Sequence, residues 1–447
     1  MISGARIDPA RRDAGKARRS RRLPALKIED AADLAVEQGF DRRQAGGQRF
    51  ASFGAATKTD TDGIGGLRRC EHFARAASAG GRDAGLQAAR DAFYKGDIAR
   101  TIVAYHEQNG GFLSMDDLAG FSAEVEPALR STFRDAEIHS CGFWCQGPSL
   151  LQMLNMVEAS GIADLKHNSP DYIHVLAETI KLAFADRAAH FGDPRHVDVP
   201  GDTLLSKAYA EARVRAIDPD HAIRGLPESG LPVGATADRA TGGDDLPKGV
   251  DPTLDTSYVA VVDRHGNAFS ATPSDASNNM PVIPGTGLCP SSRGSQSWAI
   301  PGHPATIAPG RRPRLTPNPS MAISSNGSVM PFGTPGGDVQ TQAMLQVFLN
   351  IELFGMELQN AVEAPRFATF SYESSFEPHE IQVDRLMVED PIDPATIAAL
   401  ASKGHDAQPW PAMNWRAGSV CVVRHDATTG VRTAGADPRR PTYALGW

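Results

Sequence analysis

Apolar positions recur every three to four residues between about residues 85 and 195, which is the period of an amphipathic helix. Ser114 precedes two acidic residues and is expected to cap the N-terminus of one helix. The last helix is expected to be long and amphipathic, and to stop at Gly192 and Pro194. The predicted helical stretches are residues 86–111, 114–121, 147–161 and 169–194.

The pattern changes after about residue 255, where short apolar runs separated by polar turns predict strands. Residues 256–275 form one predicted hairpin, and residues 319–333 form a second one around an Asn-Gly turn. A glycine turn then leads into a predicted helix over 334–355, followed by a short helix at 358–364 and a strand at 419–426. An antiparallel sheet covered by helices follows from this order, which gives an α+β fold class.

The chain is expected to have three parts: residues 1–85, 86–255 and 256–447. The first part is rich in Arg, Ala and Gly and contains one helical patch at 28–40, closed by Gly39. The second part ends in a stretch of Gly, Pro and Asp at 225–253, which is expected to be an exposed linker.

Composition narrows the class of protein. The 447 residues are 41% hydrophobic and 22% charged, which is ordinary for a globular protein, and the net charge of -8 argues against general nucleic-acid binding. No apolar run approaches a membrane span, and the Arg-rich first 22 residues lack the apolar core of a secretory signal. We therefore expect no membrane association and a cytoplasmic location, with the periplasm as the alternative if the N-terminus is incomplete.

Five cysteines without a framework spacing fit a reducing compartment, and Cys141 and Cys145 are expected to be structural thiols. The chain contains no phosphate-binding loop, dinucleotide fingerprint or zinc-protease motif, so no cofactor and no metal are predicted. His174 and His190 are expected to lie on helices in surface or satisfied core positions, and His265 in a solvated turn.

Thr256 is the first candidate for chemistry because it opens a strand directly behind the predicted linker. If the bond between Asp255 and Thr256 were cut, Thr256 would carry a free α-amine and a β-hydroxyl on one residue. An α-amine has a pKa near 7.7–8.0, so it could act as the general base for its own hydroxyl. The competing interpretation is an ordinary threonine at a strand edge.

Gly336 and Gly337 are the second candidate, because they lie between a predicted strand and a predicted helix. Glycine N–H groups can approach a ligand closely, and a helix N-terminus favours negative charge. These properties suit an oxyanion hole for acyl transfer, although a tight structural turn would use the same residues.

Several stretches, in this order, resemble the γ-glutamyltranspeptidase family of the N-terminal nucleophile hydrolases. They include AFYKGDIARTI, QGPSLLQMLNMVE, TSYVAVVDRHGNAFSAT, RGSQSW, FGTPGGDVQTQAMLQVFLNIELFG and GADPRR. The resemblance extends from about residue 86 to the end. It implies a four-layer αββα sandwich and a chain that cuts itself before a threonine.

The resemblance also assigns site residues. Self-cleavage falls between Asp255 and Thr256, and Thr256 becomes the nucleophile of a smaller fragment that stays bound to the larger one. Ser274 matches the family's second hydroxyl residue, which hydrogen-bonds the nucleophile, and Gly336 and Gly337 match its oxyanion glycines. The implied partners are a small γ-glutamyl or other acyl amide as donor and water or an amine as acceptor.

The substrate pocket departs from the family pattern. Gln296 stands where the family holds the substrate's α-amino group with an Asp, and Leu315-Thr316 replaces a Ser-Ser pair that contacts the α-carboxylate. The family's N-terminal segment, with its carboxylate-binding Arg, has no match in residues 1–85, so the N-terminal part of the sandwich is expected to be incomplete. Two alternatives to a γ-glutamyltransferase or hydrolase remain: a glutaryl or cephalosporin-type acylase, and an inert relative that does not process.

Overall fold

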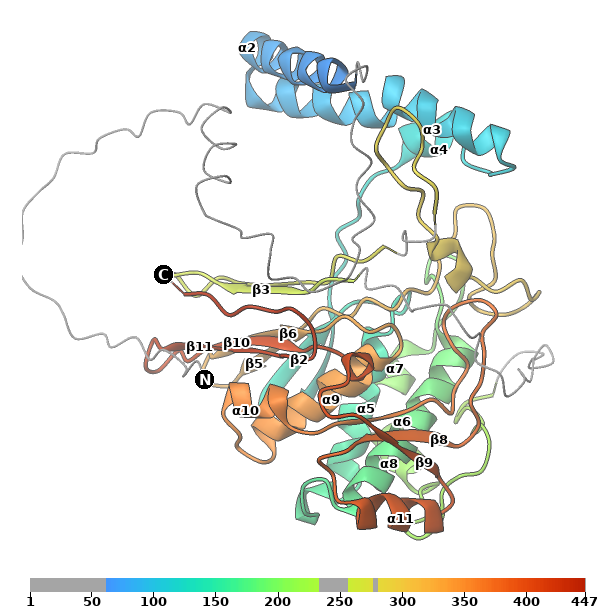
Figure 1. The fold of residues 1–447 in the computed structure, drawn as a ribbon, viewed down its shortest axis with the longest axis vertical. Helices are drawn as coiled ribbons and strands as arrows, with labels where there is room; N and C mark the ends of the chain where they lie inside the picture. The colour runs from blue at the N-terminus through green and yellow to red at the C-terminus, as the bar shows by residue number, and fades with distance from the viewer. Residues whose placement is uncertain (1–61, 233–255, 276–279, 447) are drawn as a thin grey trace, which may run out of the picture. The chain divides into compact units, whose positions relative to one another are not determined.

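The computed structural model describes residues 62–232, 256–275 and 280–446. The predicted helical patch at 28–40, most of the predicted linker and Asp255 lie outside these ranges. The described residues fall into two compact units, one formed by 123–282 and 288–447 and the other by 62–122 and 283–287. Figure 1 shows the elements of both units. The predicted boundaries at 85 and 255 stay predictions.

The smaller unit is helical, as the periodicity predicts from residue 86 onward, but the helical part before residue 86 was not predicted. It contains α2 (Asp62–Tyr94), α3 (Asp97–Gln108) and α4 (Met115–Gly120). Gly81 interrupts α2 with a left-handed φ of 81°, so two helical segments meet there. Ser114 caps α4 as expected: its side chain accepts from the Asp117 N–H, and Asp117 accepts from the Ser114 N–H.

A six-stranded sheet forms the centre of the larger unit, in the order β1-β2-β5-β6-β10-β11. Every neighbouring pair is antiparallel. The predicted hairpin around Asn326-Gly327 is confirmed as β5 and β6, and Gly327 has the positive φ of 83° that its turn needs. The strands are β1 (Leu129–Phe133), β2 (Ala136–Ser140), β5 (Ser320–Ser324), β6 (Val329–Gly333), β10 (Cys421–His425) and β11 (Arg432–Ala436).

Helices cover one face of this sheet and a second hairpin covers the other (Figure 1). The helices that pack on it include α5 (Gly147–Ala159), α9 (Val339–Glu352) and α10 (Leu358–Glu363). Phe332 of β6 stacks on Phe348 of α9 with ring centres 5.5 Å apart, and Phe133 of β1 meets the same ring edge-on at 5.6 Å. These buried aromatic contacts join the sheet to its helical layer.

The hairpin on the other face consists of β3 (Val259–Val262) and β4 (Ala268–Ala271). It packs on β6 and β10, so helices, sheet and hairpin form successive layers of the larger unit. The α+β class is therefore confirmed, and these layers correspond to the α/β/β part of the predicted sandwich.

Helix α6 (Pro170–His190) has the predicted position, but it does not have one buried face and one exposed face as predicted. It is buried on nearly all sides, including the charged residues Glu178, Lys181, Asp186 and Arg187. The periodicity was misleading because each of these charges meets a partner from elsewhere in the chain; Asp186, for example, accepts from Tyr209 Oη at 2.9 Å.

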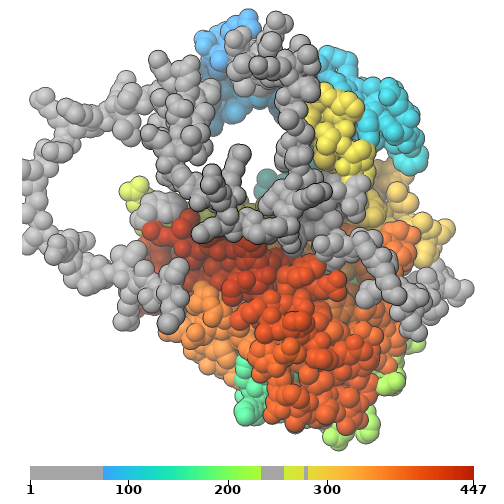
Figure 2. Space-filling view, viewed as in Figure 1, coloured from blue at the N-terminus to red at the C-terminus, as the bar shows by residue number. Residues whose placement is uncertain are grey.

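The remaining described elements complete the larger unit. A small sheet has the order β7-β8-β9, with β8 and β9 parallel. The elements are α7 (Gly201–Leu204), α8 (Lys207–Val214), α10 (Leu358–Glu363), α11 (Pro394–Ser402), β7 (Phe367–Thr369), β8 (Arg385–Glu389), β9 (Asp406–Trp410) and the short 3-10 turns η1 (Ile162–Asp164), η2 (Arg293–Gln296) and η3 (Trp415–Ala417). Figure 2 shows that residues of the C-terminal quarter form much of one face.

None of the described helices combines the length and the apolar character that a membrane crossing requires.

Candidate active site

The β3–β4 hairpin brings the predicted nucleophile to its predicted partner. The ladder pairs Val259 with Ala271, and the Ser257 N–H continues it by donating to the Pro273 carbonyl at 2.9 Å. Extending the same register by one more residue sets Thr256 opposite Ser274. Their hydroxyl oxygens lie 2.6 Å apart, at hydrogen-bond distance.

The tight turn of this hairpin fixes the register. The Asp263 side chain accepts from the N–H groups of His265 and Asn267, at 2.8 and 2.9 Å. Gly266 supplies a φ of 84° that the turn requires. A one-residue slip would therefore break these bonds and move Thr256 to the opposite face.

Arg293 links this pair to the predicted substrate residues. It lies on η2 and is 8% exposed. Its Nη2 donates to the Ser274 hydroxyl, and its Nη1 donates to Gln296 Oε1 at 3.1 Å. Gln296 Nε2 in turn donates to Thr316 Oγ1 at 3.3 Å. Arg293 was not among the predicted site residues, although its place one helical turn before Gln296 in RGSQSW was a usable signal.

Gly336 and Gly337 form the turn between β6 and α9, as predicted. Their φ angles are 136° and 56°, both in the region that side-chain-bearing residues rarely adopt. Their carbonyls accept from the first N–H groups of α9, those of Val339 and Gln340. Among the described residues no acceptor meets the N–H of either glycine, which leaves two adjacent donors at a helix N-terminus.

Gln146 connects this turn to the substrate residues. Its Nε2 donates to the carbonyls of Thr316 and Gly337, at 2.6 and 2.8 Å. Phe376 adds a second connection, because it lies 3.6 Å from where a Gly337 Cβ would stand and 5.6 Å, ring centre to guanidinium carbon, from Arg293. The predicted residues Thr256, Ser274, Gln296, Thr316 and Gly337 thus belong to one continuous set of contacts.

A buried ion pair between Arg187 and Asp338 stabilises the Gly336-Gly337 turn. Arg187 of α6 donates to Gln146 Oε1 at 3.2 Å and to Asp338 Oδ1 at 2.5 Å. Asp338 directly follows Gly337 and also accepts from the N–H and hydroxyl of Ser375. Burial raises the pKa of Asp338, but the Arg187 charge and the Ser375 bonds outweigh it and keep that pKa below its usual value. The turn is therefore held by an ionised carboxylate.

Comparison with known proteins identifies the family. The Gamma-glutamyltranspeptidase family model matches residues 70–447. The chain belongs to this family. The Acylase ACY 1 proenzyme of Pseudomonas sp. (strain SE83) is 33% identical over 70% of this chain and 51% of its own length. The Glutathione hydrolase-like YwrD proenzyme of Bacillus subtilis (strain 168) is 28% identical over 80% of this chain and 63% of its own length.

The fold is shared with solved structures. A solved structure described as "Structure of LmbA2991HD" superposes with a TM-score of 0.77 at 35% identity, over 87% of this chain and 68% of that one. The chain spans only about half to two thirds of the length of the curated relatives named above.

A first prediction concerns the glycine turn. Gly337→Val is expected to lower turnover of an acyl amide by roughly 10²–10³, because it places a Cβ beside the oxyanion donors and disturbs their alignment. Steady-state kinetics on processed protein measures this loss. Gly430→Val is the matched control, since Gly430 has a similar positive φ of 71° in an open turn with nothing within 4 Å. Equal turnover in both variants would contradict the oxyanion role.

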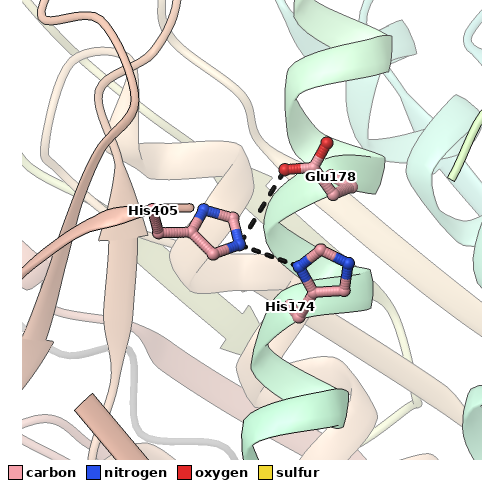
Figure 3. A group of neighbouring side chains, drawn as sticks. All are labelled: His174, Glu178 and His405. Atoms are coloured by element: carbon pink, nitrogen blue, oxygen red, sulfur yellow. Dashed lines mark hydrogen bonds and ion pairs between the residues drawn. The ribbon is translucent and has the colours of Figure 1, made fainter. Parts of the chain in front are cut away.

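The larger unit also contains a buried polar cluster of His174, Glu178 and His405 (Figure 3). His174 Nε2 lies 2.7 Å from the Asp218 carbonyl and must donate to it, so His174 Nδ1 accepts from His405 Nε2 at 2.8 Å. Lys181 donates to Glu178 at 3.0 Å. These donors already use the atoms that a cation would need, so we interpret the cluster as a structural hydrogen-bond network and propose no metal there.

Two other predicted histidines lie where expected. His190 is half-buried and lies at hydrogen-bond distance from the Ser229 hydroxyl, and His265 is exposed in the β3–β4 turn. Cys141 and Cys145 are free thiols, partly and fully buried.

The buried cluster of His174, Glu178 and His405 is expected to make the stability of the folded protein sensitive to acid. Burial, followed by the nearby His174 and Lys181, lowers the pKa of His405 to about 3, whereas an unfolded histidine titrates near 6.5. Below pH 6.5 the unfolded chain binds a proton that the folded chain refuses, so stability falls as pH falls. This group alone contributes a loss of about 2 kcal/mol between pH 7 and pH 5.

Urea unfolding at the two pH values tests this. His405→Gln keeps an N–H donor without titrating and is expected to reduce the acid loss by about that 2 kcal/mol. His265→Gln, at an exposed turn, is expected to leave the loss unchanged. An acid loss that is the same in His405→Gln and wild type would show that His405 is protonated in the folded protein.

Proposed function

We propose that this chain is a self-cleaving acyltransferase or amidohydrolase of the γ-glutamyltranspeptidase type. The observation that carries the proposal is the 2.6 Å contact between Thr256 and Ser274, just before the start of β3. Cleavage before Thr256 would give this residue a free α-amine beside its own hydroxyl. The arrangement needs no histidine base, because the amine can take the hydroxyl proton directly or through water.

The proposed reaction has two halves. The Thr256 amine takes the proton of Oγ1, and Oγ1 attacks the amide carbon to form a C–O bond. The N–H groups of Gly336 and Gly337 receive the negative charge that develops on the carbonyl oxygen. The C–N bond then breaks, and the leaving nitrogen takes the proton from the α-amine. Water or an acceptor amine then attacks the ester carbon and gives a proton to the α-amine. The bond from that carbon to Oγ1 breaks, and Oγ1 takes the proton back, which restores Thr256.

The proposed donors are γ-glutamyl amides or related acyl amides, bound beside Gln296 and Thr316. A glutaryl or cephalosporin-type acylase is the second candidate, favoured by the neutral, fully buried Gln296 and by the similarity to an acylase. An ionised hydrogen-bond partner is about twice as strong as a neutral one, so Gln296 is a weak partner for a substrate ammonium. Both candidates share the same nucleophile and the same bound pair of fragments.

A third prediction concerns the purified protein. Incubation at neutral pH is expected to yield two fragments, the smaller beginning with Thr256. Intact mass spectrometry and N-terminal sequencing measure this outcome. A chain that stays full-length after long incubation would favour the remaining alternative, an inert relative that keeps the fold without maturation.

A further inference from the structure

Tyr258 connects the strand that carries the candidate nucleophile to the central sheet. Partly buried and exposed residues alternate along 256–262, which puts Thr256 and Tyr258 on the same, partly buried face of the chain. Since β3 packs on β6 and β10, this is the face that meets the central sheet. The Tyr258 hydroxyl lies 2.8 Å from the Ser270 hydroxyl of β4, which ties the ring to its own hairpin. A shift of the Tyr258 ring therefore moves Thr256 with it.

Gly333, the last residue of β6, makes room for this ring. The three atoms nearest to where a Gly333 Cβ would stand all belong to Tyr258: Cζ lies 2.9 Å away, and Cδ2 and Cε2 are closer still. Gly333 has ordinary strand geometry and pairs with Cys421 of β10, so its backbone does not require a glycine. The missing side chain instead allows the close approach of the aromatic ring.

Gly333 also leads directly into the glycine turn. Thr334 and Pro335 separate it from Gly336. The buried Thr334 hydroxyl donates to the Pro335 carbonyl at 2.7 Å and accepts from the Ser419 N–H at 2.6 Å. Because these bonds fix the connection, the end of β6 holds the glycine turn in one place.

We propose that Tyr258 is a positioning residue for acyl transfer. Seated on Gly333, its ring sets Thr256 Oγ1 at the distance from the glycine turn that the attack requires. The inference rests on the proposed function for the roles of the nucleophile and the turn, which must act on the same carbonyl group. A misplacement of about 1 Å can lower a rate by about 10². The contact between Tyr258 and Gly333 lies two residues from the nucleophile and three from the turn, so it controls their separation.

Kinetics on processed protein test this contact, with γ-glutamyl- and glutaryl-p-nitroanilide as the substrates. Tyr258→Ala is expected to lower kcat by roughly 10- to 100-fold while KM stays within about threefold, because binding is kept and alignment is lost. Gly333→Ala places a methyl group where the ring lies and is expected to lower kcat to a similar extent. Tyr258→Phe keeps the ring and is expected to keep kcat within about threefold of wild type. Rates are expressed per small fragment, so that slow maturation does not count as lost turnover.

The double variant that combines Tyr258→Ala with Gly333→Ala separates positioning from general damage. Once the ring is gone, the new methyl group has nothing to displace. Gly333→Ala is therefore expected to add less than about a twofold loss to that of Tyr258→Ala, whereas two independent defects would multiply.

Phe269→Ala is the matched control, because it removes an aromatic ring from the outer face of the same hairpin, where Phe269 is 58% exposed. It should leave kcat and KM within about twofold of wild type. Losses that multiply in the double variant overturn the inference. So does a kcat within about threefold of wild type in Gly333→Ala, even if Tyr258→Ala does not fold. Wild-type protein that neither cleaves itself nor turns over either anilide overturns the proposed function as well, whereas an active wild type with unaffected variants overturns the positioning role alone.

Discussion

Thr256→Ala is expected to abolish self-cleavage and to lower turnover by roughly 10⁴–10⁶, the range seen when a covalent nucleophile is removed. The substitution removes the hydroxyl that lies 2.6 Å from the Ser274 hydroxyl. The bond from Arg293 to Ser274 remains. Without it no ester can form. A gel would show a single full-length band, and product formation from an acyl amide would fall to background.

Two companion variants isolate the hydroxyl. Thr256→Ser keeps it and is expected to process, more slowly. Ser257→Ala is the matched control, because Ser257 is exposed and its N–H, not its side chain, continues the hairpin ladder. Thr256→Ala protein that still cleaves after residue 255, or Ser257→Ala protein that does not, would move the nucleophile to another residue.

Periodicity predicted the elements that bury one regular face. The β5–β6 hairpin and helices α5 and α9 lie where their patterns place them. The surroundings of α6 could not be predicted, since each of its four buried charged residues forms a hydrogen bond with a residue distant in the chain. Lys181, for example, has Glu178 one turn away but also donates to the Ile223 carbonyl. A pattern of hydrophobic positions carries no information on such tertiary partners.

Some short strands were also not predicted from the sequence. The β1–β2 hairpin was not predicted, because its strands are short and polar residues such as the exposed Arg130 and the partly exposed Glu137 interrupt the apolar ones. It is instead specified by pairing: β2 forms a complete ladder with β5, nearly two hundred residues later. Strand pairing over that separation is decided by tertiary contacts rather than by local preference.

The candidate site divides in the same way. The Thr256–Ser274 contact follows from the register of one local hairpin, and the Gly336-Gly337 turn follows from a strand-to-helix connection. The role of Gln146 could not be predicted from local sequence, because its hydrogen bonds go to Thr316 and Gly337, which are far away along the chain. Local sequence thus predicts the candidate reacting groups, whereas the residues that hold them together emerge only from the fold.

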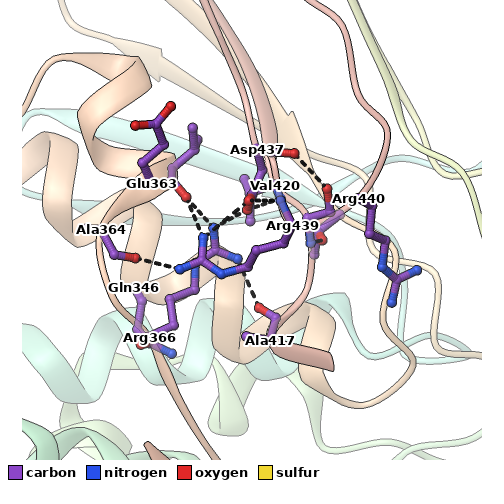
Figure 4. A network of polar contacts seen from close by, with 12 residues as sticks. Gln346, Glu363, Ala364, Arg366, Ala417, Val420, Asp437, Arg439 and Arg440 are labelled. Carbon is purple, nitrogen blue, oxygen red and sulfur yellow. Dashed lines mark hydrogen bonds and ion pairs between the residues drawn. The ribbon is translucent and has the colours of Figure 1, made fainter. Parts of the chain in front are cut away.

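The GADPRR stretch near the C-terminus, one of those carrying the family resemblance, contributes a buried charge network to the larger unit (Figure 4). Asp437 is fully buried and accepts from the Arg366 side chain, the Val420 N–H and the Arg439 N–H and side chain. Glu389 pairs with Arg439 at 2.5 Å, so two carboxylates balance two guanidinium groups. This balance makes the network tolerable in the interior and sensitive to the loss of one member.

Asp437→Ala is accordingly expected to lower the free energy of unfolding by about 3–5 kcal/mol, because it leaves Arg366 buried without its carboxylate and frees the Val420 N–H. Urea unfolding of the Thr256→Ala chain measures the effect on a single uncleaved polypeptide. Asp406→Asn is the matched control. This change breaks the ion pair between Asp406 and Arg385, whose side chains are 42% and 30% exposed, respectively. Such partly exposed ion pairs contribute about 1 kcal/mol or less to stability. If Asp437→Ala costs no more than Asp406→Asn, the network is not a source of stability, and the stretch must be explained by another role.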